Sequence, residues 1–396
     1  MNFSLCSVPA GWKFAGGVAG IKESGSADLM VAVSDRPASA AGVFTRNLVV
    51  GAPVTVGRGR VPAGAVRGVV INSGNANTGT GAKGLEDARA MTRTLAGEIG
   101  CDEGDVLVCS TGIIGHMLPV EKILAAIPGV YESRAETPAA VRDAAAAMMT
   151  TDTFPKVASR EIKIGDGTVR VLGLAKGAAM IAPDMATMLG VVVTDAVLSP
   201  ETADVILKTA VDDSFNLISV DGHTSTSDTV FLLANGASGV DGEGSAALAS
   251  AVAEVCGELA EMIVRDAEGA EHLIELHVAG AADRDGAVTI AKAVANSALV
   301  KTAVTGNDPN WGRIVSAAGY AGMPFEPTAV SLSVEGVSVY ERGTPVGFDE
   351  EAVSAAMRDG DRVRIELTVG DGPGRVRFLT SDLTAEYVRL NSEYTT

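Results

Sequence analysis

The sequence is poor in aromatic residues, cysteine, histidine and basic charge. Aromatic side chains make up 4% of the 396 residues, which argues against stacking platforms for nucleic-acid bases. Lysine and arginine number 31 against 49 aspartates and glutamates, a formal net charge of −18. Because a nucleic-acid partner requires a basic face, we expect a small-molecule substrate and no nucleic acid.

The few cysteines and histidines do not form an evident metal motif. His272 and His277 are five residues apart, whereas a helical metal pair is spaced by four. The four cysteines show no paired spacing: Cys6, Cys101, Cys109 and Cys256. We therefore expect free thiols in a reducing cytoplasm, and neither a metal nor another cofactor.

Long apolar runs are also missing. No run reaches the roughly 18 residues that a membrane helix needs, and the first 20 residues have no basic region before an apolar stretch. The sequence thus predicts a cytoplasmic protein without a membrane partner. With 47% hydrophobic and 20% charged residues, the chain has the composition of a globular protein of about two to three domains.

Strand-like and helix-like segments alternate along the chain, which predicts an α/β fold. Residues 66–71 and 188–193 are typical buried strands, and residues 85–99 and 289–304 are typical helices. From residue 328 onward strand patterns dominate. A change of composition near residue 280 indicates a smaller C-terminal domain, from about 280 to 396.

The most informative segment runs from Lys176 to Leu189. Thr187 follows the small residue Ala186 and directly precedes the apolar run 188–193. If the Ala186–Thr187 bond were cut, Thr187 would carry both a hydroxyl nucleophile and a free α-amine, whose unperturbed pKa of about 7.7–8.0 suits a base at neutral pH. The plain alternative is an ordinary strand start, since Ala-Thr before an apolar strand is common.

Acyl chemistry at Thr187 also needs donors for a developing oxyanion. Thr111 and Gly112 stand at the end of a predicted strand in a glycine-containing loop, where a free N–H and a hydroxyl can converge. An ordinary strand-to-helix turn explains the same spacing.

Longer strings resemble one family. Lys-Gly-Ala-Ala-Met-Ile-Ala-Pro-Asp-Met-Ala-Thr-Met-Leu, residues 176–189, closely resembles the processing segment of the ornithine acetyltransferase (glutamate N-acetyltransferase) family of arginine biosynthesis. Ser-Thr-Gly-Ile-Ile-Gly, residues 110–115, is similar to the family's oxyanion loop. Residues 42–47, 72–77 and 308–313 add to the match, which covers nearly the whole chain.

The resemblance implies a fold and a chain organisation. The fold is α/β (α+β), an αββα sandwich of the aminopeptidase/ornithine acetyltransferase type with a smaller α/β C-terminal domain. Self-cleavage between Ala186 and Thr187 gives an alpha chain, residues 1–186, and a beta chain, residues 187–396, assembled as two copies of each.

The resemblance also implies the site residues. Thr187 is the nucleophile, and Thr111 and Gly112 form the oxyanion hole. The family's substrate-binding positions fall on Thr150, Lys176, Thr187, Glu268, Asn391 and Thr396. Thr151 competes with Thr150 for one of these roles.

The implied activity is ping-pong transfer of acetyl from N2-acetyl-L-ornithine to L-glutamate through an acetyl-threonine, without a cofactor. Acetyl-CoA is a second acetyl donor in bifunctional members, and the motifs do not decide this point. Two alternatives remain: an N-terminal-nucleophile aminopeptidase or amidohydrolase, and an unprocessed binding protein.

The sequence departs from the family pattern at three places. Ala179 stands where the family usually has glycine, which would alter the backbone near Met180. Glu271 and His272 replace Thr-Lys, which would reshape the edge of the pocket. Residues 78–80, Thr-Gly-Thr, replace Ala-Cys-Thr. None of these touches the nucleophile or the oxyanion loop.

Overall fold

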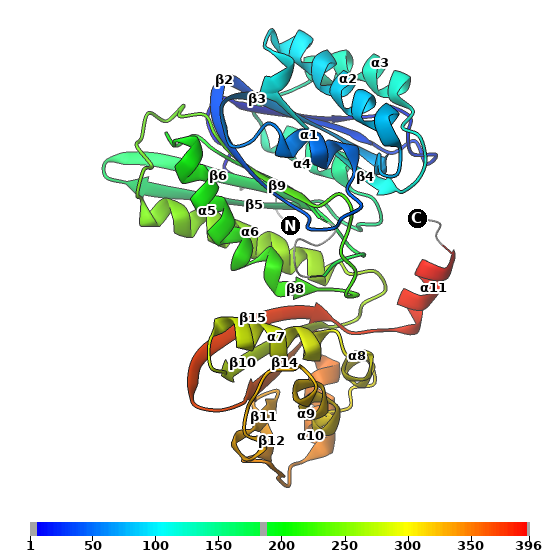
Figure 1. The fold of residues 1–396 in the computed structure, drawn as a ribbon, viewed down its shortest axis with the longest axis vertical. Coiled ribbons are helices and arrows are strands. Elements are labelled where there is room, and N and C mark those ends of the chain that lie inside the picture. The colour runs from blue at the N-terminus through cyan, green and yellow to red at the C-terminus, as the bar shows by residue number, and fades with distance from the viewer. Residues whose placement is uncertain (1–5, 183–187, 394–396) are drawn as a thin grey trace.

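The computed structural model describes residues 6–182 and 188–393, and Figure 1 shows helices packed on two sheets. The first sheet consists of β1 (Trp12–Gly17), β2 (Leu29–Phe44), β3 (Ala63–Asn75), β4 (Val106–Ile113), β5 (Lys156–Ile164), β6 (Gly167–Lys176), β7 (Leu189–Thr194) and β9 (Thr229–Ala234). Its strand order is β4-β3-β2-β9-β7-β6-β5, and β1 also pairs with β2.

The long strand β2 divides this sheet into two leaves. Its first part, to Val33, pairs in register with β1 and β3, and its last part, from Ser39, pairs with β9. The register shifts between Val33 and Ala38, and such irregularities bend a strand. One leaf therefore contains β1, β3 and β4, and the other contains β9, β7, β6 and β5.

Side-chain alternation separates the core of this sheet into layers. Leu189, Val191 and Val193 of β7 join one apolar cluster with strands of both leaves, whereas Val192 packs into a second cluster with the helices of its own leaf. Each such buried aliphatic side chain stabilises the fold by about 1.5–3 kcal/mol. The two leaves thus face each other across a shared core.

Helices cover the outer face of each leaf. The first leaf packs against α2 (Gly81–Ile99) and α3 (Val120–Glu132), near α1 (Ala52–Arg58), and the second packs against α5 (Pro200–Asp212) and α6 (Ala246–Arg265). Helix α4 (Pro138–Met148) contributes to the core between the leaves. The predicted αββα sandwich is confirmed.

The second sheet has the order β13-β12-β11-β14-β10-β15-β8. Its strands are β8 (Ile218–Ser219), β10 (Leu273–Gly280), β11 (Ser331–Val334), β12 (Val337–Glu341), β13 (Thr344–Pro345), β14 (Arg362–Thr368) and β15 (Gly372–Ser381). The helices that share its apolar core are α7 (Arg284–Ala295), α8 (Ala298–Thr305), α9 (Trp311–Gly319) and α10 (Glu350–Asp359).

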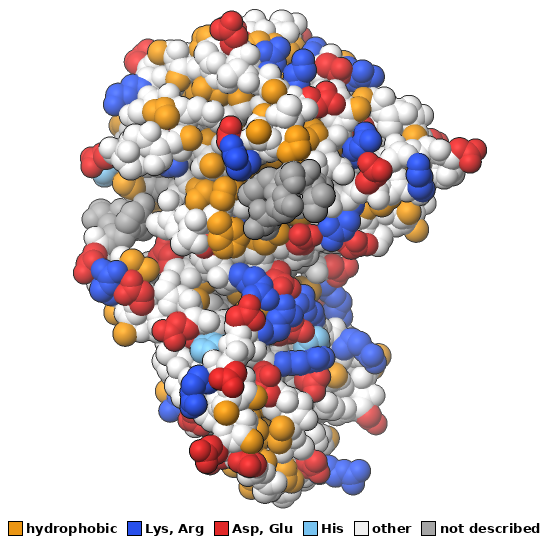
Figure 2. Space-filling view, turned by 180° about the vertical axis from the view of Figure 1, so that it is seen from behind, with side chains coloured by type: hydrophobic (Ala, Val, Ile, Leu, Met, Phe, Trp, Pro, Cys, Tyr) orange, Lys and Arg blue, Asp and Glu red, His pale blue; other side chains and the backbone are white. Residues whose placement is uncertain are grey.

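The opposite face of the second sheet carries charged side chains. Arg362 and Arg377 each pair with Glu261 of α6 and with Glu275 of β10. In the view from behind, Lys and Arg side chains gather with acidic ones just below mid-height of the molecule (Figure 2). Because arginine side chains pair with glutamate side chains on this face of the sheet, it carries both positive and negative charges.

The second sheet begins in the chain with β10 at Leu273, but it also takes in β8, which pairs with β15. The last helix, α11 (Ala385–Glu393), leaves this sheet and returns to the level of the first (Figure 1). The smaller C-terminal domain from about residue 280 stays a prediction.

One expectation of secondary structure was wrong. Residues 289–304 do not form one helix, because Ser297 caps a new helix, α8, and its hydroxyl accepts the Val300 N–H at 3.4 Å. After residue 328 strands dominate, as expected, and α10 and α11 accompany them. Within residues 289–304 the local apolar pattern continues through a helix boundary that a polar cap determines.

Within the described residues, no single helix has the length and apolar character to cross a membrane. Helices α7 and α8 pass that test only as a pair, and they are bent by 59° at their break.

Candidate active site

A cavity of about 270 Å³ brings together the predicted site residues that the structure describes. Thr111, Gly112, Thr150, Thr151, Lys176, Glu268 and Asn391 all line it. They come from the ends of β4 and β6, from the segments after α4 and α6, and from α11. Ala186, Thr187 and Thr396 lie outside the described residues. The roles of all these residues stay predictions.

The candidate oxyanion loop is held at the end of β4. This strand runs parallel to β3 and pairs Thr111 with Ser73 and Gly112 with Gly74. Gly112 has φ +131°, and a Cβ there would lie 2.3 Å from the carbonyl carbon of Gly74. Only glycine suits this position, so the backbone of the loop meets the cavity directly.

Buried side-chain hydrogen bonds hold this loop in place. The Ser110 hydroxyl donates to Asn72 Oδ1 at 2.6 Å, and Asn72 Nδ2 donates to the Asn75 carbonyl at 2.9 Å. Asn75 Nδ2 in turn donates to the His116 carbonyl at 3.2 Å. Rigid donors are what oxyanion stabilisation requires.

Lys176 at the end of β6 is a buried cation of the cavity, 3% exposed. Its Nζ lies 4.0 Å from Asp152 Oδ2, and no described residue makes a closer ion pair with it. Burial lowers the pKa of Lys176, an effect that the charge of Asp152 partly offsets. Because its ion pair with Asp152 spans 4.0 Å, the ammonium of Lys176 can still bind an anionic group of a substrate.

Asp152, next to Lys176, accepts hydrogen bonds from three groups that together form the floor of the cavity. It accepts Lys156 Nζ at 2.6 Å, the Gly177 N–H at 2.6 Å and the Thr150 N–H at 2.9 Å. Burial raises the pKa of Asp152, but the charges of Lys176 and Lys156 and these hydrogen bonds outweigh it and hold the pKa well below the usual range. The carboxylate thus stays ionised at neutral pH.

A second buried carboxylate completes this network. Lys156 is fully buried and also donates to Asp266 Oδ2 at 2.5 Å. Asp266 follows α6 and accepts the backbone N–H of Thr153 at 3.0 Å. The network joins the Thr150 segment to the end of α6, where Glu268 lies.

Glu268 and Asn391 meet at the rim of the cavity. Asn391 Nδ2 donates to Glu268 Oε2 at 3.0 Å, and the Glu268 N–H donates to the Ala178 carbonyl at 3.0 Å. The end of α6, the segment after β6 and helix α11 thus form one wall.

Sequence reasoning missed Asp221 and Tyr387. Both line the cavity, and the Tyr387 hydroxyl donates to Asp221 Oδ2 at 3.2 Å. Burial, together with the neighbouring Asp221 carboxylate, raises the pKa of Tyr387 above its usual range. The available signal was the polar run 219–228 before a buried strand, because the other site loops stand beside strands in the same way.

Ala179, which stands where the family usually has glycine, lines the cavity. The next residue, Met180, has φ +57°, a left-handed conformation that is strained for a side chain of this kind. Asp221 holds this backbone by accepting the N–H groups of Met180 at 2.7 Å and Ile181 at 2.9 Å.

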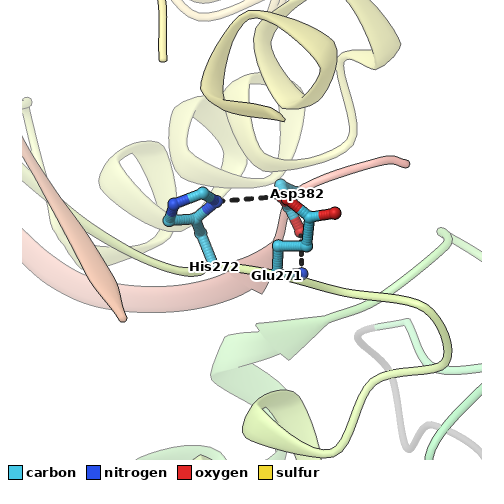
Figure 3. Close-up of side chains that lie close together, drawn as sticks. All are labelled: Glu271, His272 and Asp382. Atoms are coloured by element: carbon cyan, nitrogen blue, oxygen red, sulfur yellow. Dashed lines mark hydrogen bonds and ion pairs between the residues drawn. The ribbon is translucent and has the colours of Figure 1, made fainter. Parts of the chain in front are cut away.

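The departure at Glu271 and His272 lies beside the second sheet, where Figure 3 shows both residues facing Asp382. One donor atom from each lies within 4.8 Å of the others. Asp382 already accepts the Glu271 N–H at 3.0 Å and contacts His272 Nδ1 at 3.1 Å. These contacts form an aspartate–histidine pair, and neither Glu271 nor His272 lines the cavity.

The chain is similar to known proteins over nearly its full length. The ArgJ family model matches residues 13–396. The arginine biosynthesis bifunctional protein ArgJ of Rhodopirellula baltica is 47% identical over 395 residues, covering 98% of this chain and 96% of that protein. The protein of the same name from Geobacter sulfurreducens is 44% identical and covers 98% and 99%.

Two solved structures are also similar in sequence. The arginine biosynthesis bifunctional protein ArgJ of Bacillus halodurans is 35% identical, covers 50% of this chain and 96% of that chain, and has a TM-score of 0.48. The ornithine acetyltransferase of Mycobacterium tuberculosis, complexed with ornithine, is 34% identical and covers 46% and 96%, with a TM-score of 0.40. From the family match and the full-length relatives, the chain belongs to the ArgJ family.

Proposed function

We propose that this chain, an acetyltransferase of arginine biosynthesis, moves acetyl from N2-acetyl-L-ornithine to L-glutamate with Thr187 as its nucleophile. Thr187 becomes an N-terminal residue when the chain cuts itself after Ala186. The observation that carries the proposal is the gathering of Thr111, Gly112 and Lys176 around one cavity with Glu268.

The chain cuts itself by an N-to-O acyl shift. The Thr187 hydroxyl attacks the Ala186 carbonyl, the C–N bond breaks, and the hydroxyl proton passes to the leaving nitrogen. Water then hydrolyses the ester, adding OH to the Ala186 carbonyl carbon and H to the threonine oxygen. The freed α-amine is a base close to its own hydroxyl.

The transfer then runs in two similar halves. The Thr187 hydroxyl attacks the acetyl carbonyl of the donor while its α-amine takes the hydroxyl proton. The C–N bond breaks and that proton goes to the ornithine nitrogen. Glutamate enters and its amine attacks the acetyl ester. The bond between the acetyl carbon and the threonine oxygen breaks, and the proton lost by the glutamate nitrogen passes through the α-amine to the threonine oxygen. In this proposal the Gly112 N–H and the Thr111 hydroxyl donate to the oxyanion in each half.

The charged groups of the cavity suit both amino acids. Lys176 is the candidate partner for a substrate carboxylate, and Glu268 is the candidate partner for the ornithine ammonium. Thr150 and Asn391 offer further hydrogen bonds, with Thr151 as a competitor of Thr150. No bound cofactor takes part in these steps.

Several finer points belong to the same proposal. The two cleaved chains assemble as two copies of each, in the cytoplasm. Relatives are named bifunctional, which favours acetyl-CoA as a second acetyl donor here. Size-exclusion chromatography with light scattering tests the assembly, and glutamate acetylation by purified enzyme with acetyl-CoA alone tests the second donor.

Thr187→Ala tests the central claim. The variant is expected to stay uncut on intact-mass analysis and to lose acetyl transfer, whereas Thr168→Ala, in the exposed hairpin of β5 and β6, is expected to cut and to transfer normally. Retained transfer in Thr187→Ala would refute the nucleophile. Steady release of acetate from N-acetylornithine without glutamate would identify a hydrolase instead.

A further inference from the structure

Helix α11 forms part of the cavity wall, although apolar packing does little to hold it there. The helix has 9 residues, and none of them is buried. The chain carries it away from the second sheet and back to the level of the first (Figure 1). Because helices shorter than about 12–15 residues are marginal without tertiary contacts, the polar contacts of α11 determine whether it stays in place.

Both ends of α11 bind the segment that follows α6. At the start, the Thr384 hydroxyl accepts the Tyr387 N–H at 3.1 Å and donates to the Gly269 carbonyl at 2.5 Å. Near the other end, Asn391 Nδ2 donates to Glu268 Oε2 at 3.0 Å. These contacts fix the helix along one side.

Tyr387 joins the middle of the helix to a second segment, the loop after β8. Its side chain is half-buried, and its hydroxyl donates to Asp221 Oδ2 at 3.2 Å. That carboxylate is a fixed acceptor, because Oδ2 also accepts the Met180 N–H at 2.7 Å, and Oδ1 accepts the N–H groups of Ile181 at 2.9 Å and His223 at 3.2 Å. Hydrogen bonds to a charged acceptor are stronger than neutral ones.

The backbone that carries Asp221 is held independently of α11. Lys301 of α8 is 4% exposed, and its ammonium donates to the Val220 carbonyl at 2.6 Å and to the Thr380 hydroxyl at 3.1 Å. The Val220 N–H donates to the Ile181 carbonyl at 2.7 Å. The contact between Tyr387 and Asp221 therefore fixes the helix to the loop, and the loop does not need the helix.

We propose that Tyr387 is a positioning residue: its hydroxyl binds α11 to Asp221 and so holds Asn391 at the rim, where the amide contacts a substrate. The role of Asn391 rests on the proposed function. Burial and the Asp221 carboxylate raise the pKa of Tyr387, so the hydroxyl keeps its proton and stays a donor. Tyr387 itself takes no part in the transfer of acetyl.

Tyr387→Phe removes the hydroxyl and keeps the ring. The loss of one hydrogen bond to a charged acceptor is expected to lower kcat/KM for N-acetylornithine about tenfold. The loss is expected in KM, with kcat changed by less than about twofold, because Thr111 and Gly112 belong to β4 and not to α11.

A double-mutant cycle with Asn391→Ala tests whether Tyr387 acts through the helix. Asn391→Ala alone is expected to lower kcat/KM about tenfold, and the double variant is expected to lose no more than this single variant, within about twofold. If the Tyr387 hydroxyl contacted the substrate directly, the two losses would multiply to about a hundredfold, which overturns the proposal.

Hydrogen exchange of residues 385–393, followed by mass spectrometry, measures the position of the helix without turnover. In Tyr387→Phe these amides are expected to exchange about tenfold faster than in the wild type. Tyr320→Phe is the matched control, because Tyr320 is 63% exposed after α9 and does not line the cavity. It is expected to keep the wild-type exchange and kinetics.

Unchanged exchange of α11 or unchanged kcat/KM in Tyr387→Phe overturns the proposal. A Tyr387→Phe protein that does not fold, while Tyr320→Phe does, overturns it too, because a positioning role leaves the fold intact. Failure of the proposed function gives a different result: the wild type transfers no acetyl, although α11 still exchanges faster in Tyr387→Phe. That result refutes the role of Asn391 in the reaction and supports the contact that holds the helix.

Discussion

Lys156 is expected to hold the floor of the cavity together although it does not line it. Its ammonium donates to Asp152 at 2.6 Å and to Asp266 at 2.5 Å, with all three side chains buried. Lys156→Met removes the shared cation and leaves two buried carboxylates. Removing one partner of a buried ion pair costs about 3–5 kcal/mol, so we expect a loss of that size in the free energy of unfolding at pH 7.

The loss is expected to depend on pH with a defined sign. In the wild type the pKa of Asp152 is depressed, so its contribution is present above the usual aspartate range and fades only as the pH falls well below that range. Without Lys156 the folded-state pKa of Asp152 rises, and protonation of Asp152 relieves its repulsion with Asp266. The deficit of the variant should therefore shrink as the pH is lowered from 7 to 5.

Urea unfolding of the purified protein at pH 7 and pH 5, followed by fluorescence, measures both effects. Lys163→Met is the control, because Lys163 is exposed and its ammonium donates a hydrogen bond to Thr168 in the same hairpin. A deficit below about 1 kcal/mol, the size of a surface pair, would refute the reasoning. A deficit that grows on acidification would refute the pH argument.

Three further outcomes follow from the geometry. Gly112→Ala forces a Cβ to within 2.3 Å of the β3 backbone and is expected to lower turnover by about 10²–10³ in an acetyl-transfer assay, whereas Gly97→Ala, with open space around it, leaves turnover unchanged. Glu268→Gln is expected to reduce kcat/KM for N-acetylornithine roughly tenfold to a hundredfold, the equivalent of one charged hydrogen bond; an unchanged kcat/KM would exclude substrate contact. Burial raises the pKa of Cys109 and Cys256 to about 12, so a thiol reagent at pH 8 should label them only after unfolding.

Two predicted site residues lie at the ends of strands that the sequence pattern indicates. Thr111 and Lys176 lie at the ends of β4 and β6, and strand periodicity predicts such strands. It does not predict that the two ends meet, because β4 and β6 belong to different leaves of the sheet. Asn391 lies in a helix that returns to the cavity, which no local pattern indicates. Only the resemblance to a family predicted its presence there.

Other features have no local signal. The sequence around Lys156 is that of an exposed strand residue, yet its side chain is fully buried because Asp266, 110 residues away, supplies a second carboxylate. Asp221 and Tyr387 meet in the same way across 166 residues. Such pairs depend on tertiary packing, which overrides the usual rule that charged side chains are exposed.

The proposed ping-pong reaction requires one cavity to accept two amino acids of opposite side-chain charge. N2-acetylornithine and glutamate share an α-carboxylate and an α-nitrogen, and the acetyl group moves between those two nitrogens. The shared carboxylate suits Lys176, which is buried and whose ion pair with Asp152 spans 4.0 Å. In this proposal the ends that differ, an ammonium and a carboxylate, point to the rim, where Asn391 is exposed beside Glu268. There the amide of Asn391 can turn a donor or an acceptor toward the ligand, and water screens the mismatch between Glu268 and the glutamate side chain. In this proposal the buried Lys176 therefore selects the carboxylate that both substrates share. The exposed Glu268 and Asn391 tolerate the side-chain ends in which the substrates differ.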